Sequence, residues 1–231
     1  MKEEISSLEL HYLVKEFQDI INGRVDKIYQ DGRSFLITMH VRGKGRRLLK
    51  IDSNIIYLTE HKEEFAETPP GYCAFLRKYL SGGFIREIKQ IDFERILEIT
   101  FESKERKYFM IIELFSNGNV ILCDEEYKVL SALESHKWKD RTVRGGIKYE
   151  HPPEQNNSFE LYEKEFSEII KNSKRDALVK TLAKEISLGG LYAEELCLLS
   201  KVDKIMKPTL NEIKELHKQL KKLFSKKIKA N

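Results

Sequence analysis

Cysteine is scarce in this chain, and the three cysteines are poorly placed for joint chemistry. Cys73, Cys123 and Cys197 are far apart and odd in number, no CxxC pair occurs, and the six histidines are scattered. Zinc ribbons, dithiol redox centres and disulfide frameworks all need paired or closely spaced ligands. We therefore expect a protein that holds no metal and no cofactor.

Long hydrophobic runs are also lacking. No stretch approaches the roughly 20 apolar residues that a membrane span needs. The first ten residues, MKEEISSLEL, lack the apolar segment of a secretion signal. The sequence therefore indicates a cytoplasmic protein that does not enter a membrane.

Motifs for catalysis are missing as well. The chain contains no GxSxG, no SxxK, no local Cys–His grouping and no glycine-rich phosphate loop of the GxxxxGKS/T or GxGxxG type. Carboxylates stand side by side at Glu3–Glu4, Glu63–Glu64 and Glu125–Glu126, in charged stretches where we expect them to be solvated. This composition favours a binding protein over an enzyme.

Charge, in contrast, is abundant. Of the 231 residues 34% are charged and 41% are hydrophobic, which suffices for the cores of one large or two small domains. The net charge of +4 is unevenly distributed, because ten lysines but only three acids lie between Lys201 and Lys229. Such a tail is suited to phosphate, although a solvated lysine-rich helix face has the same composition.

The apolar pattern predicts a mixed first half. Residues 6–22 have helical spacing, with Ser6 or Ser7 as N-cap and Gly23 as the stop. Two β hairpins follow, with turns at Asp31-Gly32 and Asp52-Ser53. A helix is then expected from Pro70 to Leu80, ended by Gly82-Gly83.

A second β block occupies residues 84–133, with five expected strands: FIREIKQI, RILEITF, KYFMIIELF, GNVILCD and YKVLSAL. Residues 144–157 read as a loop and a domain boundary. Beyond it the pattern is helical, at about 159–172, 175–186, 191–199 and 207–225. We expect an α+β domain followed by an all-helical module.

Two short segments have a composition suited to nucleic acid. Arg77, Lys78 and Tyr79 place cations and an aromatic ring on one short helix, where they can pair phosphates and stack bases. Asp92-Phe93-Glu94-Arg95 puts an acid beside an arginine on a tight turn, which suits bidentate recognition. An ordinary basic helix surface and an ordinary turn composition explain the same residues equally well.

The order of these segments resembles the NFACT (RqcH/NEMF-like) family, and implies an archaeal member of it. MKEEISSLELHYLVKEF resembles the opening helix of the family's NFACT-N domain, and GRVDKIYQ its first strand. TPPGYCAFLRKYLSGGFIREIKQIDFERILEITF resembles its central segment, and IIELFSNGNVILCDEEYKVLSAL its second sheet. LVKTLAKEISLGGLYAEELCLLS is similar to the helix-hairpin-helix module that follows. The resemblance to the NFACT-N domain covers about residues 1–154. Together with the helix-hairpin-helix segment it covers nearly the whole chain.

The resemblance implies a fold and a domain order. The fold would be α+β, with an NFACT-N domain built as a β sandwich with helices, like the N-terminal domain of formamidopyrimidine-DNA glycosylases, and then a helix-hairpin-helix module. The domains would be residues 1–154, 155–206, and a basic helix at 207–231 that starts the family's coiled-coil arm. That arm and the later NFACT-R domain are missing from these 231 residues.

The resemblance also implies a function in ribosome-associated quality control. Such a factor binds tRNA on a large ribosomal subunit obstructed by peptidyl-tRNA, and supports untemplated tailing of the stalled chain. Glu9 matches an Asp of the family's opening helix, and Glu94 and Arg95 match an Asp-Arg pair in a turn. Both acids are Glu here, and the extra methylene changes their reach. Arg77 and Lys78 match a basic helix, and Arg141 and Arg144 are weaker phosphate candidates.

Two other functions remain open. A DNA-binding, base-excision glycosylase would share the fold, but its chemistry needs an N-terminal proline amine, and Lys2 follows Met1 here. Adhesion to fibronectin or fibrinogen has been described for bacterial relatives, but the chain shows no export signal.

Overall fold

The computed structural model describes residues 4–138, 141–152 and 157–225, which form two compact units. The sheet unit consists of residues 4–5, 13–91, 95–138 and 141–152. The helical unit consists of residues 157–225 together with residues 6–12 and 92–94. The first helix, α1 (Ser7–Phe17), therefore contributes its first half to the helical unit and its second half to the sheet unit.

The predicted helices and strands of the first half are present. The elements are α1, the 3₁₀ turn η1 (Gln18–Ile20), β1 (Arg24–Asp31), β2 (Ser34–Val41), β3 (Gly45–Ile51), β4 (Ile56–Thr59), α2 (Gly71–Leu80), β5 (Phe84–Gln90), β6 (Ile96–Ser103), β7 (Arg106–Glu113), β8 (Asn119–Cys123), β9 (Val129–Ala132), β10 (His136–Lys137) and β11 (Thr142–Val143). The short β10–β11 hairpin was not predicted, because strands of two residues are too short to show the alternation of apolar and polar residues that indicates a strand.

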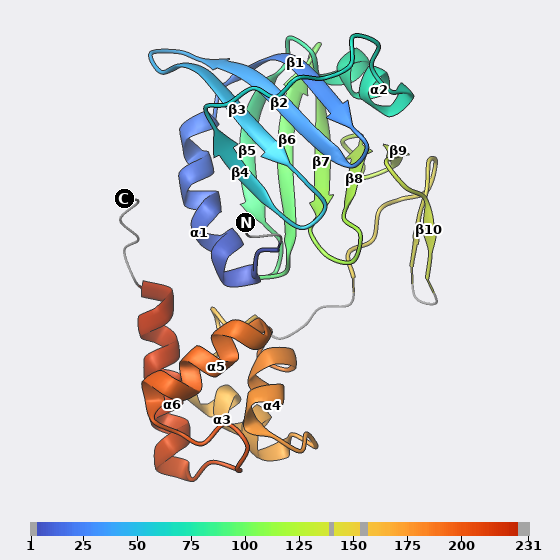
Figure 1. The fold of residues 1–231 in the computed structure, drawn as a ribbon. Helices are drawn as coiled ribbons and strands as arrows, with labels where there is room; N and C mark the ends of the chain where they lie inside the picture. The colour runs from blue at the N-terminus through green and yellow to red at the C-terminus, as the bar shows by residue number, and fades with distance from the viewer. Residues whose placement is uncertain (1–3, 139–140, 153–156, 226–231) are drawn as a thin grey trace. The chain divides into compact units, whose positions relative to one another are not determined.

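The strands β1 to β9 form one antiparallel sheet in the order β4-β3-β2-β1-β5-β6-β7-β8-β9. Its two halves meet at a single residue pair, Arg24 opposite Phe84. Both strands carry a bulge beside this junction, between Val25 and Lys27 and between Ile85 and Glu87. Because bulges bend a strand and increase its twist, the sheet can fold over there. Figure 1 shows β1–β4 lying across β5–β8. The expected sandwich is therefore one continuous folded sheet.

Helix α2 contacts strands of both halves of the sheet. Its Tyr72 hydroxyl donates to the Val120 carbonyl on β8 at 2.6 Å, and the Cys73 thiol lies 3.2 Å from the Ile28 carbonyl on β1. Leu76 and Leu80 are buried on the same face of the helix. These contacts fix the position of the exposed face of α2, which carries candidate binding residues.

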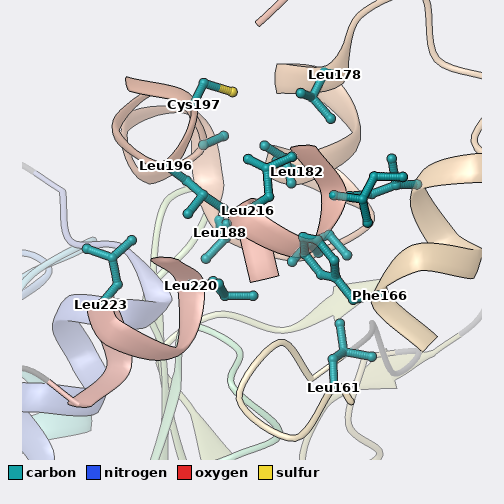
Figure 2. Close-up of a cluster of buried hydrophobic side chains, with 14 of the residues drawn as sticks. Leu161, Phe166, Leu178, Leu182, Leu188, Leu196, Cys197, Leu216, Leu220 and Leu223 are labelled. Carbon is teal, nitrogen blue, oxygen red and sulfur yellow. The ribbon is translucent and has the colours of Figure 1, made fainter. Parts of the chain in front are cut away.

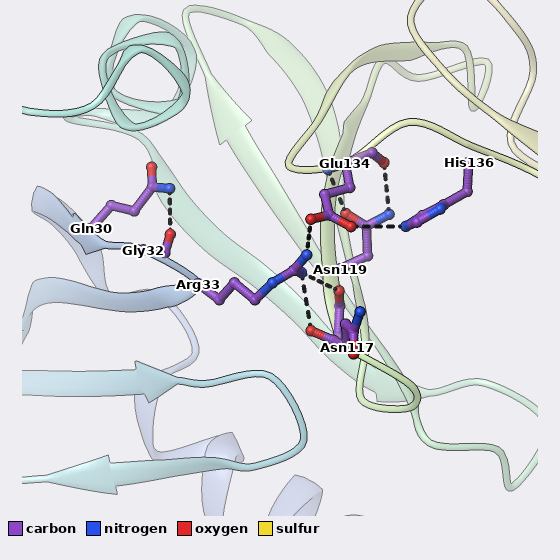
Figure 3. Close-up of polar contacts among 8 residues, drawn as sticks. Gln30, Gly32, Arg33, Asn117, Asn119, Glu134 and His136 are labelled. Carbon is purple, nitrogen blue, oxygen red and sulfur yellow. Dashed lines mark hydrogen bonds and ion pairs between the residues drawn. The ribbon is translucent and has the colours of Figure 1, made fainter.

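The turns between strands also hold the two halves together (Figure 3). Arg33, in the β1–β2 turn, donates to the Asn117 carbonyl at 3.0 Å and forms an ion pair with Glu134. The Glu134 carboxylate also lies 3.0 Å from His136, and the Asn119 amide donates to the Glu134 carbonyl at 3.0 Å. The β1–β2 turn is thereby joined to the β7–β8 turn and to the chain after β9.

The helical unit contains α3 (Glu163–Asn172), α4 (Leu178–Lys184), α5 (Gly189–Ser200) and α6 (Leu210–Ser225). Their apolar faces share one core, shown in Figure 2, to which Phe166, Leu182, Leu196 and Leu216 contribute fully buried side chains. Leu8 and Phe93 belong to the same core. No helix in the described ranges is long and apolar enough to cross a lipid bilayer.

Helix α6 differs from the separate basic segment that the sequence predicted. Ile213, Leu216, Leu220, Leu223 and Phe224 are buried in the core of the helical unit. Lys214, Lys218 and Lys222 are exposed because the apolar residues recur at helical spacing on the other face, whereas Lys221 is half-buried and donates to the Phe159 carbonyl at 3.0 Å. The sequence-based division at residue 207 thus cuts through a packed unit. That α6 starts a longer arm stays a prediction.

Candidate nucleic-acid interface

Arg77 and Lys78 lie next to each other on α2 but have different surroundings. The Arg77 Nε donates to the Ile28 carbonyl at 2.6 Å, and its guanidinium carbon lies 5.6 Å from the Tyr29 ring centroid. Lys78 is exposed, with its ammonium 5.5 Å from the Tyr79 ring. Arg77 is therefore held in place by its Nε, while Lys78 is an exposed surface cation.

The turn before β6 is anchored by an aromatic residue. Asp92 and Phe93 both adopt left-handed backbone conformations, with φ of 45° and 58°. Phe93 is nevertheless buried, and its ring lies 5.4 Å from that of Phe224 and 6.2 Å from that of Phe159. A left-handed conformation costs about 1–2 kcal/mol in a residue with a Cβ. Burial of the Phe93 ring in the core of the helical unit offsets this cost.

Arg95 follows this turn and has a fixed backbone. Its carbonyl accepts a 2.8 Å hydrogen bond from the Leu114 amide, and its guanidinium forms an ion pair with the Glu4 carboxylate. The side chain is 27% exposed. Burial lowers the pKa of Arg95 below its usual 12.5, which still leaves the group charged at neutral pH. An anionic ligand could replace Glu4 without moving the backbone.

Glu94 lies beside Arg95 in the chain and is half-buried. Burial raises its pKa above the usual 4.5, and the nearby negative charge of Asp92 raises it further. Glu94 therefore binds a proton more readily than an ordinary glutamate does. A protonated carboxyl can donate a hydrogen bond as well as accept one.

Glu9 has a structural partner at the start of α1. Its carboxylate accepts hydrogen bonds from the Ser6 amide at 2.8 Å and the Ser6 hydroxyl at 3.1 Å, and its own amide donates to Ser6 Oγ at 3.2 Å. This reciprocal arrangement is a capping box. Glu9 also contacts Tyr192 on α5, whose pKa rises to about 12 through burial and the Glu9 carboxylate. In both contacts the Glu9 side chain uses an acceptor oxygen, which a glutamine at this position would also supply.

Arg141 is placed differently from what a phosphate contact requires. Its side chain is 7% exposed and donates a 2.7 Å hydrogen bond to Glu113, whose side chain is 3% exposed. Trp138 covers the guanidinium at 4.4 Å. Because this charge is already paired and buried, we withdraw Arg141 from the candidate interface. Arg144 is exposed and stays in it.

The candidate cations do not form one patch. Lys78 lies near the C-terminal end of β6, since the Lys104 ammonium just beyond that end contacts the Lys78 carbonyl at 3.5 Å. Arg95 directly precedes the N-terminal end of the same strand. Eight residues of strand separate the two ends by about 25 Å. The sheet unit thus presents Arg77–Lys78 and Arg95 as two distant positions, while Glu9 and Glu94 belong to the helical unit.

The paired acids of the sequence have ordinary environments. Glu4 pairs with Arg95, Glu63 pairs with Lys50, and Glu125 and Glu126 are exposed; Glu3 lies outside the described residues. In the described parts of the chain, no three His, Cys, Asp or Glu side chains gather as metal ligands do.

The sequence did not single out Lys27, Lys62 or Tyr29, which the structure brings to Arg77. Both ammonium groups lie over the Tyr29 ring, at 5.3 Å for Lys27 and 4.6 Å for Lys62. Lys27 and Tyr29 are two residues apart on β1, which places both side chains on the same face of the sheet. This pair could therefore have been predicted from the sequence. The approach of Lys62 could not, because Lys62 lies in a loop that is distant in the chain.

Comparisons with known proteins agree with this architecture. The family model described as NFACT N-terminal and middle domains matches residues 6–231. A protein named archaeal Rqc2 homolog aRqcH, from Methanocaldococcus jannaschii, is 32% identical over 97% of this chain and 35% of its own length. Human ribosome quality control complex subunit NEMF is 27% identical over 86% of this chain and 19% of its own length. This chain therefore spans about a third of its archaeal relative.

Solved structures show the same fold. The crystal structure of the N-terminal domain of fibronectin-binding protein PavA from Streptococcus pneumoniae aligns with a TM-score of 0.73 at 27% identity, covering 86% of this chain and 85% of that one. The N-terminal part of the fibronectin/fibrinogen-binding protein from Streptococcus suis aligns with a TM-score of 0.77 at 25% identity, covering 94% and 85%. With the family model spanning residues 6–231, the chain belongs to the NFACT family, as the sequence predicted.

Proposed function

We propose that this chain is the N-terminal part of a ribosome quality-control factor, which binds tRNA on an obstructed large ribosomal subunit and supports tailing of the stalled nascent chain. The observation that carries the proposal is the family match over residues 6–231, together with relatives named as ribosome quality control subunits. The partners are tRNA and the large subunit carrying peptidyl-tRNA, and the factor works in the cytoplasm without a membrane.

Within this function, Arg95 is the residue to which we assign tRNA contact first. Its guanidinium is charged and partly exposed, and its only described ion-pair partner is the surface carboxylate of Glu4. Arginine presents several N–H donors in one plane, which suits a phosphate or a base edge. Glu94, the preceding residue in the chain, has a raised pKa, and its carboxyl can accept a hydrogen bond from a base or, when protonated, donate one. Lys78 and Arg144 supply exposed charge elsewhere on the sheet unit.

We also propose that α4, the turn after it and α5 form the helix-hairpin-helix module of the family, with residues 155–206 as its span. Ser187 and Gly189 have positive φ, 58° and 72°, so the chain reverses sharply between the two helices. Leu182 on α4, Leu188 in the turn and Leu196 on α5 are fully buried together in one core. Leu188-Gly189-Gly190 opens α5, and backbone N–H groups at such a helix start are suited to phosphate.

The proposal is tested by titrating a labelled tRNA transcript with the chain, as wild type and as Arg95→Ala, Glu9→Gln and Arg42→Ala. Arg42 is an exposed arginine in the β2–β3 turn and serves as the matched control. We expect Arg95→Ala to weaken binding about tenfold, consistent with loss of one charged contact worth roughly 1–3 kcal/mol, and Arg42→Ala to leave it unchanged. Unchanged affinity in both Arg95→Ala and Glu9→Gln would remove the site assignment. Absence of tRNA binding by the wild type would remove the function.

We propose binding rather than catalysis, in contrast to the base-excision alternative that the fold leaves open. A glycosylase that forms an imine with its substrate is trapped covalently by borohydride on damaged duplex DNA. We expect no adduct with this chain. A covalent adduct would replace the quality-control proposal by DNA repair.

A further inference from the structure

Five side chains from three separate segments gather on the β1–β4 half of the sheet. Lys27 and Tyr29 come from β1, Lys62 and Phe65 from the loop after β4, and Arg77 from α2. We propose that this Tyr29 cluster is a second RNA-binding site, which holds backbone phosphate and stacks one unpaired base. The inference rests on the proposed function, because it assumes that the chain binds a structured RNA.

Three cations surround one aromatic ring. The Tyr29 centroid lies 4.6 Å from the Lys62 ammonium, 5.3 Å from the Lys27 ammonium and 5.6 Å from the Arg77 guanidinium carbon. One ring attracts a cation through its quadrupole. Three cations around the same ring also repel each other, and an anion bound among them would reduce this repulsion.

The loop after β4 carries four exposed carboxylates, Glu60, Glu63, Glu64 and Glu67, so the charge of the cluster depends on which cations they pair with. Lys50, at the edge of the cluster, is buried and forms an ion pair with Glu63. Within the part of the chain that the structure describes, no carboxylate lies within 4.0 Å of the Lys27 or Lys62 ammonium nitrogen. Both lysines are exposed. The buried Lys50 is thus paired, whereas the exposed Lys27 and Lys62 are not paired with a carboxylate of the described residues. Such a surface is suited to binding an external anion.

Two aromatic rings of the cluster form a stacked pair. The Tyr29 and Phe65 rings are stacked, with centroids 5.1 Å apart and an angle of 27° between planes. Both side chains are half-buried, so part of the pair is accessible from solvent. Unpaired bases stack on aromatic side chains beside cations that hold the backbone, which is the common arrangement at single-stranded and looped RNA. The combination favours RNA over free phosphate, which would gain nothing from the rings.

The site is separate from Arg95. Arg77 lies on the same helix as Lys78, about a strand length (roughly 25 Å) from the turn that holds Arg95. A ligand that contacted both positions would have to be extended and polyanionic, as a folded RNA is. The rings are also half-buried beneath the cations, whereas a lipid surface would require exposed apolar side chains to insert.

The test compares Lys27→Ala/Lys62→Ala with Lys128→Ala/Lys148→Ala in the 231-residue chain. The second pair also removes two exposed lysines of the sheet unit and is the matched control. Binding is measured for a labelled tRNA transcript and for a single-stranded RNA oligonucleotide over a range of about 50–200 mM salt. We expect the cluster variant to bind both RNAs about tenfold more weakly and its salt slope to fall by about 2, one for each lost phosphate contact. The control should keep the wild-type slope.

The aromatic part is tested by Phe65→Leu, which removes the ring and retains a large apolar side chain. We expect about fivefold weaker binding of the single-stranded RNA, the low end for one lost stacking contact, with an unchanged salt slope. Circular dichroism and thermal unfolding of each variant establish that its fold is intact. A cluster variant that is folded and binds RNA with the wild-type affinity and slope would overturn the inference.

The remaining outcomes separate this inference from the proposed function. If the wild type binds tRNA and the cluster variant binds it equally well, the function stands and the Tyr29 site is wrong. If the wild type binds only the single-stranded RNA, through the cluster, the site stands and the tRNA function is wrong. Binding of anionic vesicles that depends on Lys27 and Lys62, without RNA binding, would assign the cluster to a membrane surface and overturn the inference.

Discussion

The Arg141 guanidinium donates a 2.7 Å hydrogen bond to the Glu113 carboxylate, and both side chains are almost fully buried. The Tyr149 hydroxyl donates to the same carboxylate oxygen at 2.8 Å. Burial raises the pKa of Tyr149, and the Glu113 charge raises it further. This group joins the end of β7 to the chain after β10, so the segment from 141 to 149 is attached to the sheet by a buried charge pair.

We predict that Arg141→Ala destabilises the sheet unit. Removing one partner leaves the Glu113 charge buried without its cation, which costs about 3–5 kcal/mol. The double variant Glu113→Gln/Arg141→Ala removes both charges and should lose clearly less than the sum of the single changes Glu113→Gln and Arg141→Ala. Denaturant unfolding of the four proteins checks this. Additive losses would show that the two side chains are not coupled.

We predict that Glu9→Ala and Glu9→Gln differ in stability. Glu9→Ala removes the acceptor for the Ser6 amide and should cost about 1 kcal/mol, as for other lost helix caps. Glu9→Gln retains an acceptor oxygen and should cost much less. Thermal unfolding gives the stability difference. Equal losses in both variants would mean that the negative charge, rather than the cap, is what stabilises α1.

The Glu94 carboxyl should titrate above 4.5, because burial and Asp92 both raise its pKa. The folded state then binds this proton more tightly than the unfolded state, so the stability contributed by Glu94 is complete below 4.5 and decreases as the pH rises through the folded pKa. NMR titration of wild type and Asp92→Asn checks the prediction. Asparagine tolerates the left-handed conformation at residue 92, and the variant should have a lower Glu94 pKa. A Glu94 pKa at or below 4.5 in the wild type would contradict it.

We predict that Gly118→Ala is far more harmful than Gly43→Ala. Both glycines have positive φ, 71° and 77°, so both changes carry the same conformational cost of about 1 kcal/mol. A Cβ at Gly118 would collide with the backbone of Ser53, whereas a Cβ at Gly43 would meet nothing within 4 Å. Denaturant unfolding should show a loss for Gly118→Ala that exceeds the loss for Gly43→Ala by at least about 1 kcal/mol, the lower range for an overpacked site. Equal losses would show that the two turns move apart at little cost.

Much of the local structure was readable from the sequence. Asp31-Gly32 predicted the β1–β2 hairpin, and Gly32 has the positive φ that such a turn uses. The apolar spacing of residues 6–22 predicted α1, although the helix ends at Phe17 and continues as a 3₁₀ turn to Ile20. These features depend on residues close in the chain, for which spacing and turn chemistry are sufficient.

The candidate site was readable only in part. The segments at residues 76–79 and 92–95 were recognised from their residue composition. In the structure Lys78 is exposed, whereas Arg77, Glu94 and Arg95 are half-buried. The sequence could not show that Arg141 is buried against Glu113, because their pairing joins residues 28 positions apart. Nor could it show that Glu9 is engaged by Ser6 and Tyr192 together.

The sequence by itself determined the family, the order of the helices and of strands β1 to β9, and the charged and aromatic residues that we propose to bind RNA. The tertiary structure decided which of those charges remain available. It paired Arg141 with a buried carboxylate and brought Lys62 from a loop to the ring of Tyr29. The physical reason is that the attraction of a charged side chain for a ligand depends on its burial and on its nearest opposite charge. Both are set by contacts between residues that are distant in the chain.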